Sequence, residues 1–503
     1  MGRASRAGPA LHGNPVRPDH PLVHRPASAA LARNENTGMS AFTQLEGHAA
    51  GLTEVFECAR QRAIEHGKPV LASYALNITA LDLLALFERV DEPHAECLFW
   101  RAPEDDKSLF GWGVAAELIG AGAQRFATVD AQWRDWLEGA VVHGPLAPTV
   151  CGGFRFDHQV KASPAWQGFG DASLLLMTLL LVRDGDACWL LCQQRVAADD
   201  VAQRCCEHVL NQWNALMDRY VSGPRPTAAP HHTRDQCLPR ACWESKIAHA
   251  LDVLRDTPLQ KVVLAREVLS EFSRPINAGR TLATLASNDP GAYLFAFRRY
   301  QACFIGASPE RLVKLHNGHL QTLALAGTTR RDPNPEHDAQ LAHALLACEK
   351  NQHEHAVVVQ IIQRDLAPWV APLQVPPAPH IKRLSRVQHL ATLIEGPLHP
   401  QRSLLDMVAL LHPTPAVGGH ERQQALEHIR QFEGFDRGWY AAPLGWLDAH
   451  GNGEFIVGLR SALLKGNQAR LFAGCGIVEH SDPACEYDET CIKLAGMRAA
   501  LQR

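Results

Sequence analysis

The sequence predicts an α+β protein with antiparallel sheet, and two patterns support that fold class. Strand-like segments come in runs joined by turns that contain Gly and Asn: 446–448, 454–464 and 468–474. Helical segments are also grouped, because apolar residues recur at helical spacing over 336–347 and again over 351–366. Strands in runs and helices in runs are typical of α+β folds.

The same patterns place the remaining elements. Helices are expected at 42–64, 199–220, 243–255 and 484–501. Strands are expected at 70–74, 154–156, 173–182, 262–265, 302–305 and 312–325, the last divided by a hairpin turn at Asn317–Gly318.

Composition narrows the class of protein. The 503 residues are 46% hydrophobic and 20% charged, an ordinary globular balance, and the net charge of −4 gives no argument for nucleic acid or an anionic membrane surface. The 14 cysteines are scattered without a CxxC pair, which favours reduced thiols in a cytoplasmic protein over a zinc site. The longest apolar run, 172–182, is shorter than the roughly 20 residues of a membrane span and predicts a buried strand.

Four parts are expected along the chain. Residues 1–40 are rich in Pro and Arg, lack the apolar core of a signal peptide and predict a disordered extension, with Met39 as an alternative start. Residues 41–221 carry no catalytic motif and are expected to complete a sheet. Residues 222–241, without periodicity, predict a linker. Residues 242–503 hold the candidate catalytic region.

Three carboxylates predict a metal site. Glu486, Glu489 and Lys493 are spaced i, i+3 and i+7 and therefore share one face of the last helix. Glu354 lies in another helix and is expected to meet Glu489 across the two helices. Carboxylate oxygens are the ligands that Mg²⁺ prefers, so these residues are candidate ligands, although the last helix alone is equally compatible with a solvated face.

Lys261 and Glu310 are candidates for proton transfer. Lys261 enters an apolar strand; it either reaches solvent or, if partly buried, acts as a general base. Glu310 follows a tight turn and is either a turn carboxylate paired with Arg311 or a general acid.

A further group is suited to binding an anion. Arg460 lies in an otherwise apolar segment, 455–464, expected to be one strand, and so needs an anionic partner from protein or ligand. The Tyr440 hydroxyl is placed to donate to the same anion. Backbone N–H groups near Gly474 and Gly476 can approach a ligand because no Cβ stands in the way. Together these residues predict a small polyanion bound through Mg²⁺.

Ten segments resemble the chorismate-binding family of isochorismate, salicylate, anthranilate and aminodeoxychorismate synthases. They are QKVVLARE (260–267), FIGASPERL (304–312), LAGT (325–328), EKNQHEH (349–355), VQHL (387–390), LHPTPAVGG (411–419), FDRGWYAAPLGW (435–446), VGLRSA (457–462), GCGIV (474–478) and EYDETCIKL (486–494). The stretch 70–87 resembles siderophore-type isochorismate synthases more weakly.

The resemblance implies one large domain of paired antiparallel β-sheets flanked by helices. It also implies that Glu354 and Glu489 bind Mg²⁺ with Glu486 close by. Carboxylate binders would be Arg460, Tyr440, Lys493 and the amides near Gly474 and Gly476, and pocket residues near the ring would be Gly327, Thr328 and His389. Lys261 would activate water, and Glu310 would protonate the leaving hydroxyl.

Three positions favour isochorismate synthase within this family. Lys261 matches the water-activating lysine, where ammonia-using anthranilate synthases have glutamine. Ala326 stands where aminodeoxychorismate synthases have a nucleophilic lysine, and Ala416 resembles isochorismate synthases, where salicylate synthases tend to have threonine. Asn351 departs from those salicylate synthases that have a metal-site acid there.

The expected activity is Mg²⁺-dependent conversion of chorismate to isochorismate for salicylate or siderophore biosynthesis, with a functional link to an isochorismate-pyruvate lyase. The alternatives are a bifunctional salicylate synthase, an anthranilate synthase and a chorismate-binding module without catalysis.

Overall fold

The structure is a computed structural model and describes residues 44–90, 94–103, 107–223 and 230–502. The expected disordered extension, 1–40, and Met39 lie outside the described residues. Helices in the first half are α2 (Ala49–His66), α3 (Leu83–Arg89), α4 (Arg125–Leu137) and α5 (Ala202–Ser222). Those in the second half are α6 (Arg240–Asp256), α7 (Ala278–Asn288), α8 (Pro335–Ala347), α9 (Glu349–Leu366), α10 (Leu404–Leu411), α11 (Arg422–Glu433) and α12 (Pro483–Leu501).

Strands make up most of the remainder. The first half contains β1 (Val70–Asn77), β2 (Cys97–Arg101), β3 (Ser108–Gly120), β4 (Val141–His143), β5 (Thr149–Phe154), β6 (Ala172–Asp184), β7 (Ala187–Val196) and β8 (His232–Cys237). The second half contains β9 (Lys261–Phe272), β10 (Tyr293–Arg299), β11 (Ala302–Ser308), β12 (Arg311–His316), β13 (His319–Arg330), β14 (His380–Arg383), β15 (Val387–Pro397), β16 (Gly419–His420), β17 (Pro443–Asp448), β18 (Gly453–Val457), β19 (Ser461–Lys465) and β20 (Gln468–Ile477).

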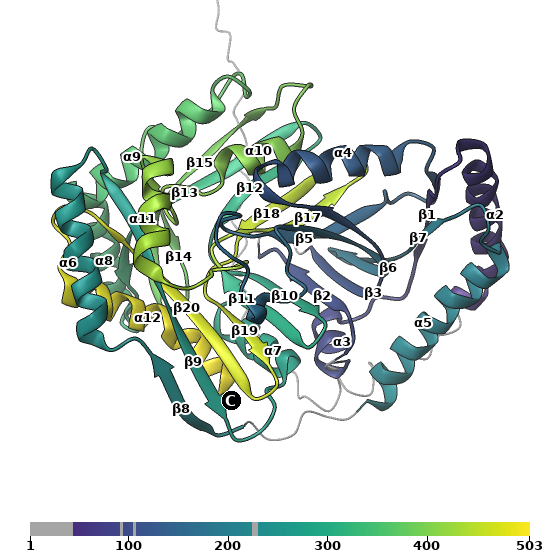
Figure 1. The fold of residues 1–503 in the computed structure, drawn as a ribbon, viewed down its shortest axis with the longest axis horizontal. Helices are drawn as coiled ribbons and strands as arrows, with labels where there is room; N and C mark the ends of the chain where they lie inside the picture. Colours follow the sequence, from purple (N-terminus) through teal and green to yellow (C-terminus); the bar gives the residue numbers. More distant parts are fainter. Residues whose placement is uncertain (1–43, 91–93, 104–106, 224–229, 503) are drawn as a thin grey trace, which may run out of the picture.

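The strands form two large sheets that share β6 (Figure 1). The first sheet runs β9–β20–β19–β11–β10–β2–β3–β6–β7–β1, and the second runs β6–β5–β17–β18–β12–β13–β15–β14. One edge of β6 pairs with β3, whereas its other edge pairs with β5 over 172–176 and with β7 over 179–184. These pairings are antiparallel, and only β1 and β4 pair in parallel among the described strands.

The main hydrophobic core lies between the two sheets. Trp100 of β2 packs against Tyr293 of β10 in its own sheet, with ring centroids 5.9 Å apart. On the other side, its ring meets Trp446 of the second sheet at 6.3 Å. A second core lies on the outer face of the first sheet under α2, α3, α5, α7 and α12. Both halves of the chain therefore build one domain, as the fold class predicts.

Three expected elements differ from the structure. The strand expected at 154–156 instead ends at Phe154, the last residue of β5, and the Phe156 N–H donates to the Gly438 carbonyl oxygen. Residues 232–237, inside the expected linker, form β8, which pairs with β9 although all six residues are exposed. Backbone pairing at a sheet edge needs no apolar pattern, so composition did not reveal it. The segment 454–464 was expected to be one strand, but β18 ends at Val457 and β19 begins at Ser461.

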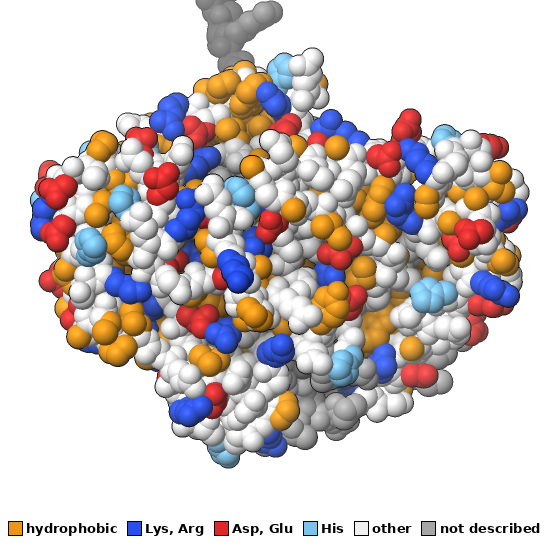
Figure 2. All heavy atoms as spheres, viewed as in Figure 1, with side chains coloured by type: hydrophobic (Ala, Val, Ile, Leu, Met, Phe, Trp, Pro, Cys, Tyr) orange, Lys and Arg blue, Asp and Glu red, His pale blue; other side chains and the backbone are white. Residues whose placement is uncertain are grey.

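Two surface properties complete the description. In the described part of the chain, no helix combines the length and apolar character that a membrane crossing requires. Basic and acidic side chains are interspersed on the face shown in Figure 2.

Candidate active site

A cavity of ≈ 270 Å³ collects every site residue that the sequence singled out. It is lined by Lys261, Glu310, Gly327, Thr328, Glu354, His389, Ala416, Tyr440, Arg460, Gly474, Gly476, Glu486, Glu489 and Lys493. Helices α9 and α12, strands β9, β13, β15 and β20, and the loops after β11, α10, α11 and β18 contribute these side chains. Segments separated by more than two hundred residues therefore meet at one cavity.

Glu310 and Arg460 occupy two points where the chain passes from one sheet to the other. Strand β11 pairs with β19 in the first sheet, whereas β12 pairs with β18 in the second. Glu310 lies between β11 and β12, and Arg460 lies between β18 and β19. The crossings are adjacent, because the Val457 N–H donates to the Glu310 carbonyl oxygen at 3.0 Å. Arg460 has a φ of +50°, so the strand expected over 455–464 is broken at the residue that faces the cavity.

Burial changes the acidity of Glu310. Its side chain is 7% exposed, and burial raises the pKa of its carboxyl from 4.5 to about 7, against the opposing effect of the Lys261 charge. Thr414 donates a long hydrogen bond to it at 3.5 Å. The expected alternative, a pair with Arg311, is wrong because Arg311 binds Glu454 at 2.7 Å. Glu310 can therefore hold a proton near neutral pH.

Lys261 is partly buried at the start of β9. Its Nζ lies 2.9 Å from Glu354 Oε1, and its side chain is 12% exposed, so it does not extend into solvent. The side chain lies across Gly476, where a Cβ would come within 2.7 Å of Lys261 Cε. Gly476 therefore leaves the space that the lysine occupies. In this arrangement Lys261 is the cationic partner of a carboxylate, and the neutral base expected from the sequence stays a prediction.

The carboxylates at one end of the cavity are partly matched by lysines. Glu354 pairs with Lys261, and Glu489 pairs with Lys493 at 2.6 Å. Lys493 also donates to the Gly474 carbonyl oxygen at 2.8 Å. Glu486 forms no ion pair with any described residue, and burial, reinforced by the charge of Glu489, raises the pKa of its carboxyl.

The acidic side chains of the cavity offer donors for a divalent cation. Among the described residues, no three His, Cys, Asp or Glu side chains already form a closed metal-binding group. Glu354, Glu486 and Glu489 nevertheless line one cavity and offer carboxylate oxygens, the donors that hard cations require. Glu486 is the one of the three without an ion pair to a described residue, and burial with the nearby Glu489 charge raises the pKa of its carboxyl, so a cation there would favour its ionised form. The chemistry of this donor set therefore fits Mg²⁺.

The cavity also contains a neutral histidine, His389. The β13–β15 register shifts between Ala326 and Thr328, and Gly327 with φ +76° occupies this bulge. The bulge brings the Thr328 hydroxyl 2.9 Å from His389 Nδ1. Burial, aided by the charges of Arg460 and Lys493, lowers the pKa of His389 to about 3. Its Nε2 is buried and has no hydrogen-bond partner among the described residues.

Tyr440 and Arg460 supply donors for an anion. The Tyr440 ring stacks on Phe472 at 5.1 Å, and its hydroxyl has no hydrogen-bond partner in the described parts of the chain. Burial raises the pKa of that hydroxyl, so Tyr440 remains a donor. Arg460 forms no ion pair with a described carboxylate, and burial lowers the pKa of its guanidinium. A ligand is therefore expected to supply the anionic partner of Arg460.

Sequence reasoning did not single out Arg437, which also lines the cavity. Its guanidinium is buried, pairs with Glu433 and donates to the carbonyl oxygens of Val263 at 2.8 Å and Val417 at 3.0 Å. It therefore joins β9 to the loop that carries Ala416. Its place in the segment FDRGWY was the available signal, but its buried partner in α11 was not visible in the sequence.

A cavity that holds an arginine without an ion pair to a described residue, clustered carboxylates and a protonatable glutamate is suited to a small anionic substrate. The comparisons with known proteins identify the family: the model described as chorismate binding enzyme matches residues 58–502. The chain belongs to the chorismate-binding enzyme family.

Individual relatives cover most of the chain. The salicylate biosynthesis isochorismate synthase of Pseudomonas aeruginosa is 44% identical over 466 residues, which span 92% of this chain and 97% of that protein. The isochorismate synthase MenF of Bacillus subtilis is 34% identical over 88% of this chain and 96% of its own. The solved menaquinone-specific isochorismate synthase of Escherichia coli superposes with a TM-score of 0.74 at 29% identity, covering 88% of this chain and 99% of that chain.

Proposed function

We propose that this protein is an isochorismate synthase, an isomerase that converts chorismate to isochorismate. Water adds at C2 of the ring, the double bond shifts, and the C4 hydroxyl leaves as water. The observation that carries the proposal is that one cavity holds Lys261 and Glu310 together with separate groups of carboxylates and cations. The relatives that cover nearly the whole chain support the same reaction.

Lys261 and Glu310 divide the proton transfers in this mechanism. Neutral Lys261 takes a proton from the attacking water and becomes cationic; after product release this proton returns to Glu310 through solvent, which resets both residues. Glu310, whose pKa of about 7 keeps a large share of it protonated at neutral pH, gives a proton to the departing C4 hydroxyl. Because one proton is taken and one is given, the net charge of the site is unchanged over a turnover.

The substrate carboxylates are assigned to opposite ends of the cavity. Arg460 and Tyr440 orient the enolpyruvyl carboxylate, since neither is matched by a described protein anion. Lys493 and the backbone at Gly474 and Gly476 lie beside the ring carboxylate. The ring of the substrate lies beside Gly327, Thr328, His389 and Ala416. The small side chain of Ala416 leaves room for the added hydroxyl.

Glu354 and Glu489 would hold Mg²⁺, with Glu486 beside them. The cation, when bound, supplies positive charge to the ring carboxylate of chorismate. Without it, the three glutamates would repel that carboxylate, which is the physical reason why the activity is proposed to depend on Mg²⁺.

The product is proposed to enter salicylate or siderophore biosynthesis in the cytoplasm, where an isochorismate-pyruvate lyase would consume it. The name of the Pseudomonas aeruginosa relative supports the salicylate branch, while that of the Escherichia coli structure concerns menaquinone.

Product analysis tests the proposal. Purified protein is incubated with chorismate and Mg²⁺, and the products are separated by chromatography. Isochorismate alone is expected; salicylate with pyruvate would instead identify a bifunctional salicylate synthase, and anthranilate formed with ammonia would identify an anthranilate synthase. Binding of chorismate with no product would overturn the enzymatic assignment altogether.

A further inference from the structure

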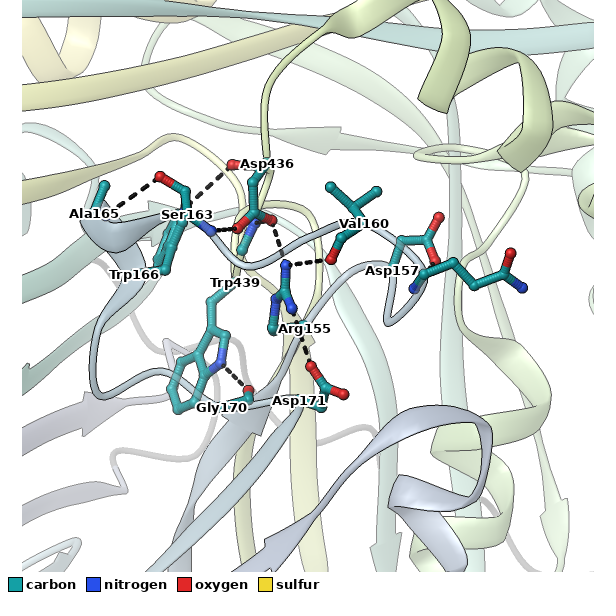
Figure 3. Close-up of polar contacts among 12 residues, drawn as sticks. Arg155, Asp157, Val160, Ser163, Ala165, Trp166, Gly170, Asp171, Asp436 and Trp439 are labelled. Carbon is teal, nitrogen blue, oxygen red and sulfur yellow. Dashed lines mark hydrogen bonds and ion pairs between the residues drawn. The ribbon is translucent and has the colours of Figure 1, made fainter.

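A tight turn, 436–440, leads to Tyr440 in the cavity lining. Residues from the first half of the chain contact Asp436 and Trp439 of this turn (Figure 3). Arg155, directly after β5, is 4% exposed. Its Nη2 donates to Asp436 Oδ1 at 2.8 Å and to the Val160 carbonyl oxygen at 3.1 Å. Its Nη1 donates to Asp171 Oδ1 at 3.1 Å. The guanidinium thus lies between an aspartate of its own half and one of the other half.

Asp436 uses both carboxylate oxygens to set the shape of the turn. Oδ1 accepts from the Gly438 N–H at 2.9 Å as well as from Arg155, and Oδ2 accepts from the Ser163 N–H at 2.8 Å. Its carbonyl oxygen accepts from the indole N–H of Trp166 at 3.1 Å. The carboxylate is 6% exposed, so these bonds are protected from water. Without Arg155, its negative charge would be buried with only neutral donors around it.

Packing reinforces the hydrogen bonds. Gly438 has φ +55°, and a Cβ there would lie 2.1 Å from the ring of Trp166. The Gly438 carbonyl oxygen accepts from the Phe156 N–H at 2.8 Å, and the Trp439 indole donates to the Gly170 carbonyl oxygen at 3.1 Å. The turn is therefore fixed along its whole length by segment 155–170, which contributes no side chain to the cavity lining.

Two residues of the turn, Arg437 and Tyr440, line the cavity. The Tyr440 N–H donates to the Arg437 carbonyl oxygen at 2.9 Å, so both residues follow the conformation that Asp436 imposes. The donors of Arg437 are occupied by Glu433 and by backbone carbonyls, whereas the Tyr440 hydroxyl is available to a ligand. A shift of the turn would consequently appear first at Tyr440.

We propose that Arg155 is a positioning residue for substrate binding: through Asp436 it fixes the turn that aims the Tyr440 hydroxyl at a substrate carboxylate. This inference rests on the proposed function, because it takes the anion bound by Tyr440 to be the enolpyruvyl carboxylate of chorismate. Tyr440 binds that carboxylate before and during the reaction alike, so loss of its alignment raises KM and leaves kcat nearly unchanged.

A matched pair of variants separates positioning from general stability. Arg299 is also 4% exposed in its side chain and pairs with Glu96 and Glu117, but it touches neither the turn nor the cavity. We expect Arg155→Gln to raise KM about tenfold, the size of one lost hydrogen bond to a charged group, with kcat within about threefold. Arg299→Gln should leave both constants within about twofold, although both variants lower the melting temperature. Equal KM effects in the two variants would overturn the inference.

A double-mutant cycle tests the route through Tyr440. In a Tyr440→Phe background, Arg155→Gln should raise KM by no more than about twofold, since the group that it positions is already gone. Full additivity of the two KM effects would contradict the proposal. Arg155→Lys, which keeps a cation beside Asp436, should recover most of the wild-type KM, and failure of this rescue would count against the charge contact.

A milder variant covers the case in which Arg155→Gln does not fold. Trp166→Phe removes the indole donor to Asp436 and part of the buried ring volume but keeps an aromatic ring near Gly438; it should raise KM about threefold, and no change would oppose the inference. Dissociation constants for chorismate, measured by calorimetry, repeat each comparison without turnover. A wild type that binds chorismate without forming isochorismate would therefore refute the proposed function alone, whereas unchanged dissociation constants in the variants would refute the role of Arg155 alone.

Discussion

Replacing Glu310 with glutamine should abolish most of the activity while making the protein more stable at alkaline pH. The substitution keeps the size and polarity of a side chain that is 7% exposed, and removes its transferable proton. A positioned general acid typically contributes about 10²–10⁴-fold, so kcat should fall by that factor, about 3–5 kcal/mol of activation free energy. KM should change little, because Arg460 and Tyr440 still bind the substrate.

The stability effect follows from the raised pKa. The folded state binds the Glu310 proton up to about pH 7, whereas the unfolded chain releases it near its ordinary value of 4.5. The stability linked to that proton is complete below about pH 4.5 and is lost as the pH rises to about 7. A difference of roughly 2.5 pH units corresponds to about 3 kcal/mol. Glu310→Gln should avoid this loss and exceed the wild type in free energy of unfolding at pH 8.

Two assays decide the matter. Chromatographic initial rates between pH 6 and 9 should show a change of slope near pH 7 in wild-type kcat/KM, where Glu310 titrates, and the residual activity of Glu310→Gln should lack it. Urea unfolding at pH 5 and pH 8 should show the stability gain of the variant only at the higher pH. An active Glu310→Gln would refute the general-acid role. A variant less stable than the wild type at pH 8 would refute the buried, proton-holding carboxyl from which that role is argued.

Other perturbations give equally direct outcomes. Lys261→Ala should lower kcat about 10²–10⁴-fold in the same chromatographic assay, and full activity would exclude it as the base. Chelation with EDTA should stop turnover and added Mg²⁺ should restore it. Glu489→Gln should raise the Mg²⁺ concentration for half-maximal rate at least about tenfold, whereas Asp488→Asn, exposed on the same helix, should leave it unchanged; similar shifts in both would argue against a ligand role. Gly438→Ala should lower the free energy of unfolding by more than about 1 kcal/mol in urea titrations because of the Trp166 contact, and wild-type stability would show that the turn can relax.

The sequence was most informative where the spacing of residues within one helix determines which side chains lie together. Glu486, Glu489 and Lys493 share a helix face through their spacing alone, and α12 places all three on the cavity. On the other faces of this helix, Asp488 lies outside the cavity and pairs with Arg240, while Leu494 and Met497 are buried. Helical periodicity constrains direction strongly, so this side of the site could be predicted without a structure.

Elsewhere, local pattern was insufficient. The run 454–464 is apolar enough to read as one strand, but its two ends pair with different sheets, and nothing local states which partner each end has. β8 is an opposite case, with six exposed residues held in a strand by backbone pairing with β9. Arg155 was equally hidden, because its significance depends on Asp436, which is 281 residues away in the chain. Long-range pairing decided each of these features.

The site lies where the two sheets exchange strands, and this location explains its chemistry. Inside either sheet, a residue such as Glu310 or Arg460 would lie against apolar side chains or point to solvent. At the paired crossings the strands leave the ladder, so backbone turns create space that stays enclosed by both sheets. A carboxyl there is buried enough to keep its proton near pH 7, and a guanidinium there has no described protein anion to neutralise it. The 155–170 segment supports the turn that carries Tyr440. The first half of the chain therefore shapes a site whose cavity side chains come from the second half.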